Sequence, residues 1–210
     1  MKPLSAFYPR ILPYAPGCSE PFAAQALVTA AIEMCEGAQV LREDLDPFYT
    51  TEGLVQYDLT DPSPQLTIAR VMGVTLDDDT DLKGVMAEEL QNIPRETAKP
   101  RAFYTDRTGS VLTLKLGPKP DDRYKVTVHV ALRPTRDATE LEDDLYNIWI
   151  DPLVNATLAK ILQVPNQPFT NFVMAEKYAK DAARGVAMSR IEGNYGLIRG
   201  SMRVRNRRFA

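Results

Sequence analysis

Two kinds of hydrophobic periodicity divide the chain, and their order along the sequence predicts an α+β fold. Apolar residues recur at intervals of three and four between residues 19 and 37 and again after residue 139, as is typical of helices with one buried face. Between residues 45 and 135, short β-rich runs separated by turn-forming residues indicate an antiparallel sheet. We therefore expect a helical core of one N-terminal and two C-terminal helices, an inserted antiparallel β module, and extended arms at both ends.

The limits of these patterns predict the parts of the chain. Residues 1–17 contain four prolines among aromatic side chains, so we expect an extended N-terminal arm without regular structure. The helical core comprises residues 18–44 and 139–193, and the inserted antiparallel β module comprises residues 45–138. Residues 194–210 form a basic C-terminal arm.

The first helix is predicted from its ends and from one buried stripe. Ser19 can cap the N-terminus, Pro21 is tolerated in the first turn, and Gly37 supplies the stop. Because the stripe is mostly alanine, another helix can approach closely, either the last helix of the same chain or a helix of a neighbouring copy. The sequence leaves both partners open for this stripe, which consists of Ala23, Ala26, Leu27, Ala30, Ala31 and Met34.

The β module is predicted to hold five strands and one short helix. The strands are the β-rich runs between turns, and the helix interrupts them at residues 83–92. The expected strands cover residues 54–59, 66–76, 102–105, 110–116 and 124–132.

A helix follows the β module and is predicted to begin with a capping box. Thr139 and Glu142 have the spacing at which two side chains cap a helix start reciprocally. The helix continues toward Leu162, and Pro152 should kink or divide it.

The last helix is predicted from residue 170 to 191. Ion pairs at i,i+4 spacing are expected on its outer face between Glu176 and Lys180 and between Lys177 and Asp181. Its inward positions are predicted to be Phe172, Ala175, Ala179, Ala182, Ala183 and Val186.

Charge is distributed unevenly along the chain. The sequence has 25 basic and 28 acidic side chains, and the last fifteen residues contain five arginines and no acid. The rest of the chain therefore has 20 basic side chains against 28 acidic ones, a net charge of about −8. A basic arm on an acidic body predicts binding to an anionic surface, either nucleic acid or an acidic groove of a protein.

Candidate catalytic patterns are scarce. His129, the sole histidine, alternates with valines, and no neighbour in the sequence would orient it, so we interpret it as a surface or strand-pair residue. The sequence has no P-loop, dinucleotide-binding or nucleophile-elbow motif. We therefore predict no catalytic residue, no cofactor and no enzyme activity.

One acidic stretch imitates a calcium-binding loop. Its sixth position is Leu82 instead of glycine, and the residues before it have the pattern of a strand instead of a helix. We interpret it as an acidic hairpin turn and predict no metal site. The ligand positions of such a loop would be Asp77, Asp79, Asp81, Lys83, Val85 and Glu88.

The cysteines and the hydropathy pattern indicate a reduced chain outside the membrane. Cys18 and Cys35 lie near opposite ends of the first predicted helix, too far apart for a disulfide. No apolar run reaches the length of a membrane span, and the proline-rich start has no apolar signal core. We expect a reduced, cytosolic chain.

A series of short motifs follows one order from the proline-rich start to the last helix. They are LPYAPGC at 12–18, AIEMCE at 31–36, VLR at 40–42, LDP at 45–47, VQYDL at 55–59, ATLAKIL at 156–162 and PNQPF at 165–169. In this order, and with an arginine-rich tail, the chain resembles the head-to-tail adaptor (connector) proteins of tailed bacteriophages. Met34 and Phe169 stand where that family would have Phe and Trp, and both replacements keep the position hydrophobic.

The resemblance implies a structural role in the virion. Adaptors of this kind look like subunits of a dodecameric ring beneath the portal, which joins the DNA-filled head to the tail at the neck after assembly in the host cytoplasm. The implied partners are the portal protein, neighbouring copies of the chain and the next tail or neck component, with DNA only as passing cargo and no membrane. The implied portal-binding residues of the arm are Arg199, Arg203, Arg205, Arg207, Arg208 and Phe209.

A nucleic-acid-binding protein that uses its tail on phosphates is the competing hypothesis. Its body would then serve for dimerisation. A protein that reads a DNA groove normally concentrates positive charge on a folded element, whereas the body of this chain is acidic. A carboxylate-metal hydrolase is the weaker third alternative.

Overall fold

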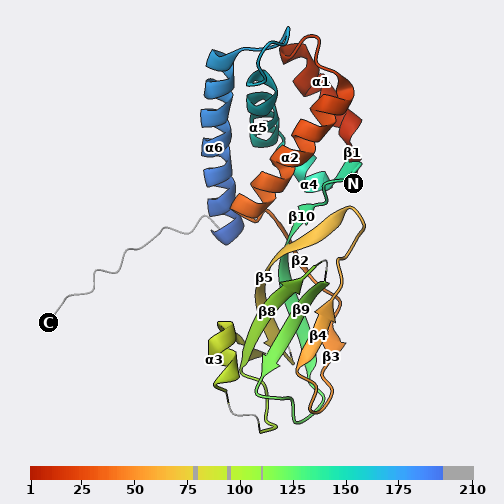
Figure 1. Ribbon diagram of the computed structural model, residues 1–210, viewed down its shortest axis with the longest axis vertical. Coiled ribbons are helices and arrows are strands. Elements are labelled where there is room, and N and C mark those ends of the chain that lie inside the picture. The colour runs from red at the N-terminus through yellow and green to blue at the C-terminus, as the bar shows by residue number, and fades with distance from the viewer. Residues whose placement is uncertain (78–79, 94–95, 110, 196–210) are drawn as a thin grey trace, which may run out of the picture.

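The protein is elongated, with helices gathered at one end and strands at the other (Figure 1). A computed structural model describes residues 1–77, 80–93, 96–109 and 111–195, which are the described residues below. Two long antiparallel strands, β5 (Leu66–Leu76) and β10 (Lys125–Pro134), extend from the helical end through the β module. The chain is therefore α+β and its sheets are mainly antiparallel, which confirms the predicted fold class.

Three helices form the body of the helical end, namely α2 (Glu20–Ala38), α5 (Ile150–Leu162) and α6 (Phe172–Tyr195). Both α2 and α6 pack against α5, so α5 buries side chains around most of its surface. A helix that is apolar on most sides is stable only in the interior of a protein. The short helix α4 (Asp143–Asn147) precedes α5, and Pro152 lies in the first turn of α5, where it removes no helical hydrogen bond.

The N-terminal segment differs from the extended arm that its prolines predict. Phe7 and Ile11 are fully buried, and the rings of Phe7 and Tyr146 form a T-shaped pair with 5.1 Å between the ring centroids. The segment forms short helices instead, and prolines lie in their first turns. A missing N–H costs nothing there, so the prolines favour these helices and do not exclude them. The segment consists of β1 (Lys2–Pro3), η1 (Leu4–Phe7), α1 (Tyr8–Ile11) and η2 (Leu12–Tyr14).

The first large sheet is built around β10. β5 pairs with one edge of β10, while β2 (Leu41–Asp44) and β3 (Phe48–Tyr49) pair with the other. β6 (Thr80–Asp81) pairs antiparallel with β5, in agreement with the acidic hairpin turn predicted from the sequence. Because β2 is part of this sheet, strand pairing begins within the segment 18–44 that the sequence assigned to helices.

The second large sheet has the order β4–β9–β8–β7, and only its β7–β8 pair is parallel. Its buried side chains join those of the first sheet and of the helices in one continuous hydrophobic core. β1 pairs separately with β11 (Glu140–Leu141) beside the helices. The remaining elements are β4 (Gln56–Leu59), β7 (Lys83–Gly84), α3 (Ala87–Gln91), β8 (Ala102–Thr108) and β9 (Val111–Gly117).

Two predicted helix ends are wrong. α2 continues past Gly37 to Ala38, and Gln39 ends it by taking the left-handed conformation with φ of 53°. Thr139 caps no helix, because Glu142 occupies the N-cap position of α4. β11 takes up the residues between them, so the pairing of β11 with β1 overrides the local capping signal.

The inward face of α6 is narrower than its periodicity predicts. Ala175 and Ala182 are buried as expected, but Phe172 and Ala183 are exposed. The reason is that, among the described residues, α6 packs mainly against α5 and to a lesser extent against α2, so side chains on its other sides are exposed.

One of the two ion pairs predicted on α6 is confirmed. Lys180 Nζ lies 2.7 Å from Glu176 Oε1. Asp181 instead pairs with Arg184, at 3.7 Å between Oδ1 and Nη1, and not with Lys177.

Candidate functional site

The arginine-rich arm, including Arg199, Arg203, Arg205, Arg207, Arg208 and Phe209, lies outside the described residues. The structure does show where the chain leads into this arm. α6 ends at Tyr195, beside the junction between the helical end and the β module (Figure 1). An arm that begins there starts from the middle of the long axis of the molecule and not from either tip.

The alanine-rich stripe of α2 is buried inside the chain. All six side chains are at most 7% exposed, because α2 packs against α5 and β10 and, near its end, approaches α6. The main helical neighbour is thus α5, although the last helix was the intrachain partner considered from the sequence. A contact of this helix with a neighbouring copy stays a prediction for its exposed side. The buried stripe consists of Ala23, Ala26, Leu27, Ala30, Ala31 and Met34.

His129 connects three strands of the first sheet. Its Nδ1 lies 2.5 Å from Asp44 Oδ1 on β2, and its Nε2 lies 2.8 Å from Thr75 Oγ1 on β5. The Thr75 hydroxyl is also 3.3 Å from Asp81 Oδ1 on β6. The partners are remote in sequence, which is why no local pattern identified them. This arrangement ties the strands together, in agreement with the strand-pair interpretation.

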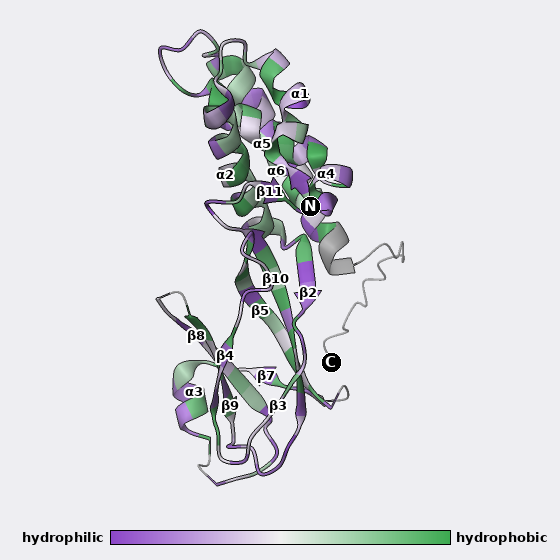
Figure 2. Ribbon diagram, turned by 90° about the vertical axis from the view of Figure 1, so that its right-hand side faces the viewer, coloured by the Kyte–Doolittle hydropathy of each residue, from purple (hydrophilic) through white to green (hydrophobic). Residues whose placement is uncertain are grey.

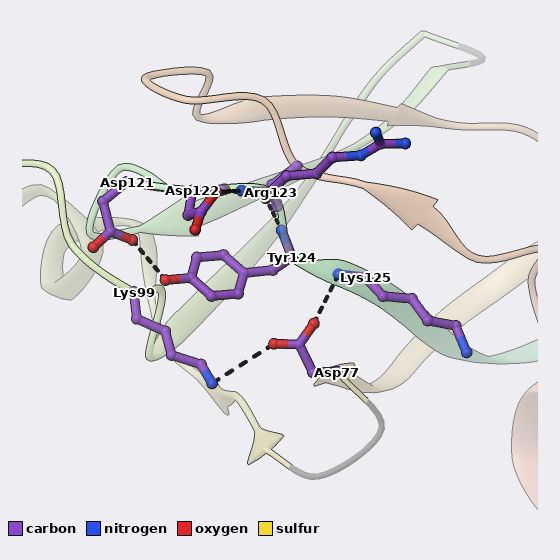
Figure 3. Close-up of polar contacts among 8 residues, drawn as sticks. Asp77, Lys99, Asp121, Asp122, Arg123, Tyr124 and Lys125 are labelled. Atoms are coloured by element: carbon purple, nitrogen blue, oxygen red, sulfur yellow. Dashed lines mark hydrogen bonds and ion pairs between the residues drawn. The ribbon is translucent and has the colours of Figure 1, made fainter.

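A second polar cluster lies where β10 begins, near the tip of the β module (Figure 3). Asp77 accepts the backbone N–H of Lys125 at 3.0 Å, and its other oxygen lies 3.8 Å from Lys99 Nζ. The Lys99 ammonium in turn lies 5.3 Å from the centre of the Tyr124 ring. The cluster therefore joins the β5–β6 turn, the start of β10 and the chain before β8.

Tyr124 is held as a hydrogen-bond donor in this cluster. Its hydroxyl donates to Asp121 Oδ1 at 2.8 Å, and this hydrogen bond to a carboxylate, with a minor contribution from burial, raises the pKa of Tyr124 to about 12. A phenol with a raised pKa stays protonated at neutral pH, so it cannot serve as a base.

An exposed ring and a guanidinium flank the same cluster. The Arg123 guanidinium lies 4.3 Å from the centre of the Tyr49 ring, within the range of a cation–π contact. Beside them the buried Thr50 hydroxyl donates to the carbonyl of Asp122 and accepts the N–H of Tyr124, both at 2.8 Å. This end of the β module is thus a polar surface held by hydrogen bonds and cation–π contacts, without an activated nucleophile among the groups described.

The calcium-loop imitation gains no support from the geometry of the described part of the chain. Asp77 uses both carboxylate oxygens on the Lys125 N–H and on Lys99. No group of three or more histidine, cysteine, aspartate or glutamate side chains among the described residues could hold a metal ion.

The two cysteines are free thiols. Cys35 is buried in α2, and this burial raises the pKa of its thiol to about 12, while Cys18 lies partly exposed before the helix. None of the helices described is long and apolar enough to cross a membrane.

The comparison with protein families agrees with the motif order of the sequence. A family model described as SU10 adaptor protein matches residues 11–207, which is nearly the whole chain. No curated protein matches the sequence. Because the match extends from the N-terminal segment through both parts of the fold and into the arginine-rich arm, the chain belongs to the SU10 adaptor protein family, in agreement with its resemblance to the head-to-tail adaptors of tailed bacteriophages.

Proposed function

We propose that this protein is a structural component of the phage neck that joins the DNA-filled head to the tail. Copies of the chain form a dodecameric ring beneath the portal protein, and the C-terminal arm of each copy docks on the portal. The β module then faces away from that joint and is available to the next tail or neck component. An adaptor of this kind catalyses no reaction.

One observation carries the docking role of the arm. The family match continues through residue 207 and so includes four of the five tail arginines, Arg199, Arg203, Arg205 and Arg207. A sequence that the family shares this far is more than a frayed end of one chain. Its charge, opposite to that of the body, suits an acidic groove on a partner protein.

Repetition makes weak contacts of this kind durable. An exposed ion pair contributes only about 0 to 1 kcal/mol. In a ring every copy offers its arm to the portal at once, so each further arm binds at a high effective concentration. The total number of arginine contacts with the portal is then five times the number of copies in the ring.

The acidic body suits passage of DNA through the ring. Outside the last fifteen residues the net charge is about −8, and like charge discourages adhesion of phosphates. DNA is then passing cargo, and the arm is reserved for protein.

The docking role is tested with the full-length chain and a truncation after Asn194, each mixed with the portal protein and separated by size. The truncation keeps nearly all of α6, so a thermal melt checks that the body remains folded. We expect the truncated chain to lose binding, and a variant with the five tail arginines changed to lysine to keep part of it, because charge remains while the bidentate geometry is lost. Equal binding of truncated and full-length chains would refute the docking role.

The same samples test the nucleic-acid alternative, which the basic arm alone favours. Strong binding of the full-length chain to DNA, with a steep loss of affinity as salt increases, would favour a phosphate-binding tail. We expect weak DNA binding because the body repels phosphate.

A further inference from the structure

β2 is an edge strand of the first sheet. It pairs with β10 on one side and with no other described strand. Leu45, directly after β2, donates its N–H to the carbonyl of Val128 on β10. Because alternate residues of a strand face opposite edges, the backbone groups of Asp44 face away from β10. An edge of this kind can take up an extended segment as a further strand.

The surface beside this edge is acidic. A hollow of about 420 Å³ lies between the end of β2, the chain that leads into β3 and the end of β4, and no described lysine or arginine lines it. Within the described part of the chain its carboxylates have no ion pair with lysine or arginine, although Asp44 contacts His129. Arg42 is the single basic side chain of β2 itself. We call this surface the β2 hollow, and its acidic side chains, all exposed, are Glu43, Asp44, Asp46, Asp58 and Asp61.

The C-terminal arm begins close to this edge. Near the end of α2, Gly37 approaches α6 so closely that a Cβ on it would lie 3.7 Å from Cγ1 of Val186. β2 begins four residues after Gly37, at Leu41, and α6 continues for nine residues after Val186, to Tyr195. The lower end of α6 is near β2 in Figure 1 and in Figure 2.

The sequence of the arm suits this surface in length, charge and pattern. Fifteen residues follow Tyr195, and seven extended residues span up to about 25 Å. The five arginines of the arm have the opposite charge to the five carboxylates of the β2 hollow. Met202 and Val204 alternate with Arg203 and Arg205, as in a strand with one apolar side and one charged side.

We propose that in the free protein the arm docks on the β2 edge and the β2 hollow of its own chain. Residues 202–205 add to β2 as a further strand, and arginines of the arm reach the carboxylates of the hollow. The portal then takes the arm from this position, a step that rests on the proposed docking role. The self-contact lowers the apparent affinity of the arm for every other acidic surface, because the arm is available only while it is away from β2.

The sole histidine of the chain reports on this contact. His129 adjoins β2, with its Nδ1 2.5 Å from Asp44 Oδ1, so its ring protons sense a spin label on a docked arm. A nitroxide is attached to Val204→Cys in a full-length Cys18→Ser chain, in which the buried Cys35 stays unlabelled. We expect strong paramagnetic broadening of the His129 ring resonances, which chemical reduction of the nitroxide abolishes.

Neutralised carboxylates test the part that the β2 hollow plays. Glu43→Gln with Asp46→Asn should reduce the broadening by about three- to tenfold, because two partners of the arginines are lost. The matched control is Glu88→Gln with Glu89→Gln, which removes the same charge from the exposed helix α3 and should leave the broadening unchanged.

A second label position tests the place of the contact. Val173 is exposed near the other end of α6, so a nitroxide on Val173→Cys should not broaden the His129 resonances. Absence of broadening from the Val204→Cys label, or an equal effect of the two pairs of charge variants, would overturn the proposal.

A mixed sample separates the chain's own arm from the arm of a neighbouring copy. Spin-labelled chains of natural isotope content are mixed with ¹³C-labelled chains that carry no nitroxide, and only the ¹³C-labelled chains are observed. We expect no broadening in this mixture. Broadening as strong as in the singly prepared sample would show a neighbour's arm on β2 and would refute the self-contact.

Portal binding separates this contact from the docking role. Glu43→Gln with Asp46→Asn should raise the affinity of the full-length chain for the portal by about three- to tenfold, because the self-contact no longer competes. An unchanged affinity would contradict that competition. Broadening in the free chain with arm-independent portal binding refutes the docking role alone, whereas arm-dependent portal binding without broadening in the free chain refutes the self-contact alone.

Discussion

Replacement of Gly185 by alanine is expected to destabilise the protein, although alanine is the better helix former. A Cβ at Gly185 in α6 would lie 2.5 Å from Cβ of Pro152 and 3.4 Å from its Cα. Nonbonded carbons prefer separations of about 3.5 to 4.0 Å, so α5 and α6 would have to separate by about 1 Å. The ring of Pro152 is closed on the backbone and cannot rotate away.

The magnitude follows from two opposing effects. Overpacking costs about 1 to 3 kcal/mol, and a clash with a rigid ring belongs at the upper end of that range. Loss of a helical glycine returns up to about 1 kcal/mol. We expect a net loss of about 2 kcal/mol in the free energy of unfolding, which lowers Tm by about 4 to 8 °C in a protein of this size.

Gly37 is the matched control, because it is also helical and lies at the contact of another helix, α2, with α6. A Cβ at this position would meet Cγ1 of Val186 at 3.7 Å, an ordinary contact. Gly37→Ala should therefore stabilise the protein by about 0.5 kcal/mol.

Urea unfolding followed by circular dichroism measures both variants against the unchanged protein. A Gly185→Ala chain as stable as the parent, or more stable, would refute the close approach of the two helices. Combining Gly185→Ala with Pro152→Gly should reduce the cost of the first change, because the Cβ that it meets is gone.

Three further outcomes are expected. Phe7→Ala should cost about 3 to 5 kcal/mol in urea unfolding, with Phe7→Leu much milder, whereas an extended arm would tolerate both. Cys18 should react with a thiol reagent in the folded protein and Cys35 only after unfolding, because burial raises the pKa of the Cys35 thiol to about 12; equal rates would contradict the buried position. Asp121→Ala should lower the pKa of Tyr124 from about 12 toward its ordinary value, as measured by phenolate absorbance against a Tyr124→Phe control.

The hydrogen bond between Tyr124 and Asp121 also predicts how the stability of the protein depends on pH. The folded protein holds Tyr124 protonated more strongly than the unfolded chain does, because Asp121 accepts its hydrogen bond. The resulting stabilisation is present below the ordinary pKa of tyrosine and is lost as pH increases toward 12. A pH dependence of stability identical in the Tyr124→Phe chain would contradict this assignment.

Local sequence patterns predicted a helix or strand correctly where its apolar positions are also the positions that the fold buries. Alternation between turns predicted β5 with the ends that it has, Leu66–Leu76. The N-terminal segment was misjudged because proline forbids helix interiors but suits first turns, and only the burial of Phe7 and Ile11 favours the short helices there.

The polar clusters around His129 and Tyr124 could not be predicted from the sequence. The partners of His129 are Asp44 and Thr75, which come from different strands, and no spacing in the sequence reveals which strands will be neighbours. Tyr124 is part of no recognisable motif either, and its acceptor Asp121 falls between two predicted strands, 110–116 and 124–132.

The sequence by itself determined the division into helical and β-rich parts, the acidic body with its basic arm, and the family of the protein. These depend on hydrophobic period, composition and motif order, all of which are local. The tertiary structure decided that α5 is the central helix and that β10 joins β2 to β5. Such relations arise when segments remote in sequence bury their apolar faces against one another, and no single segment contains the information that selects its partner.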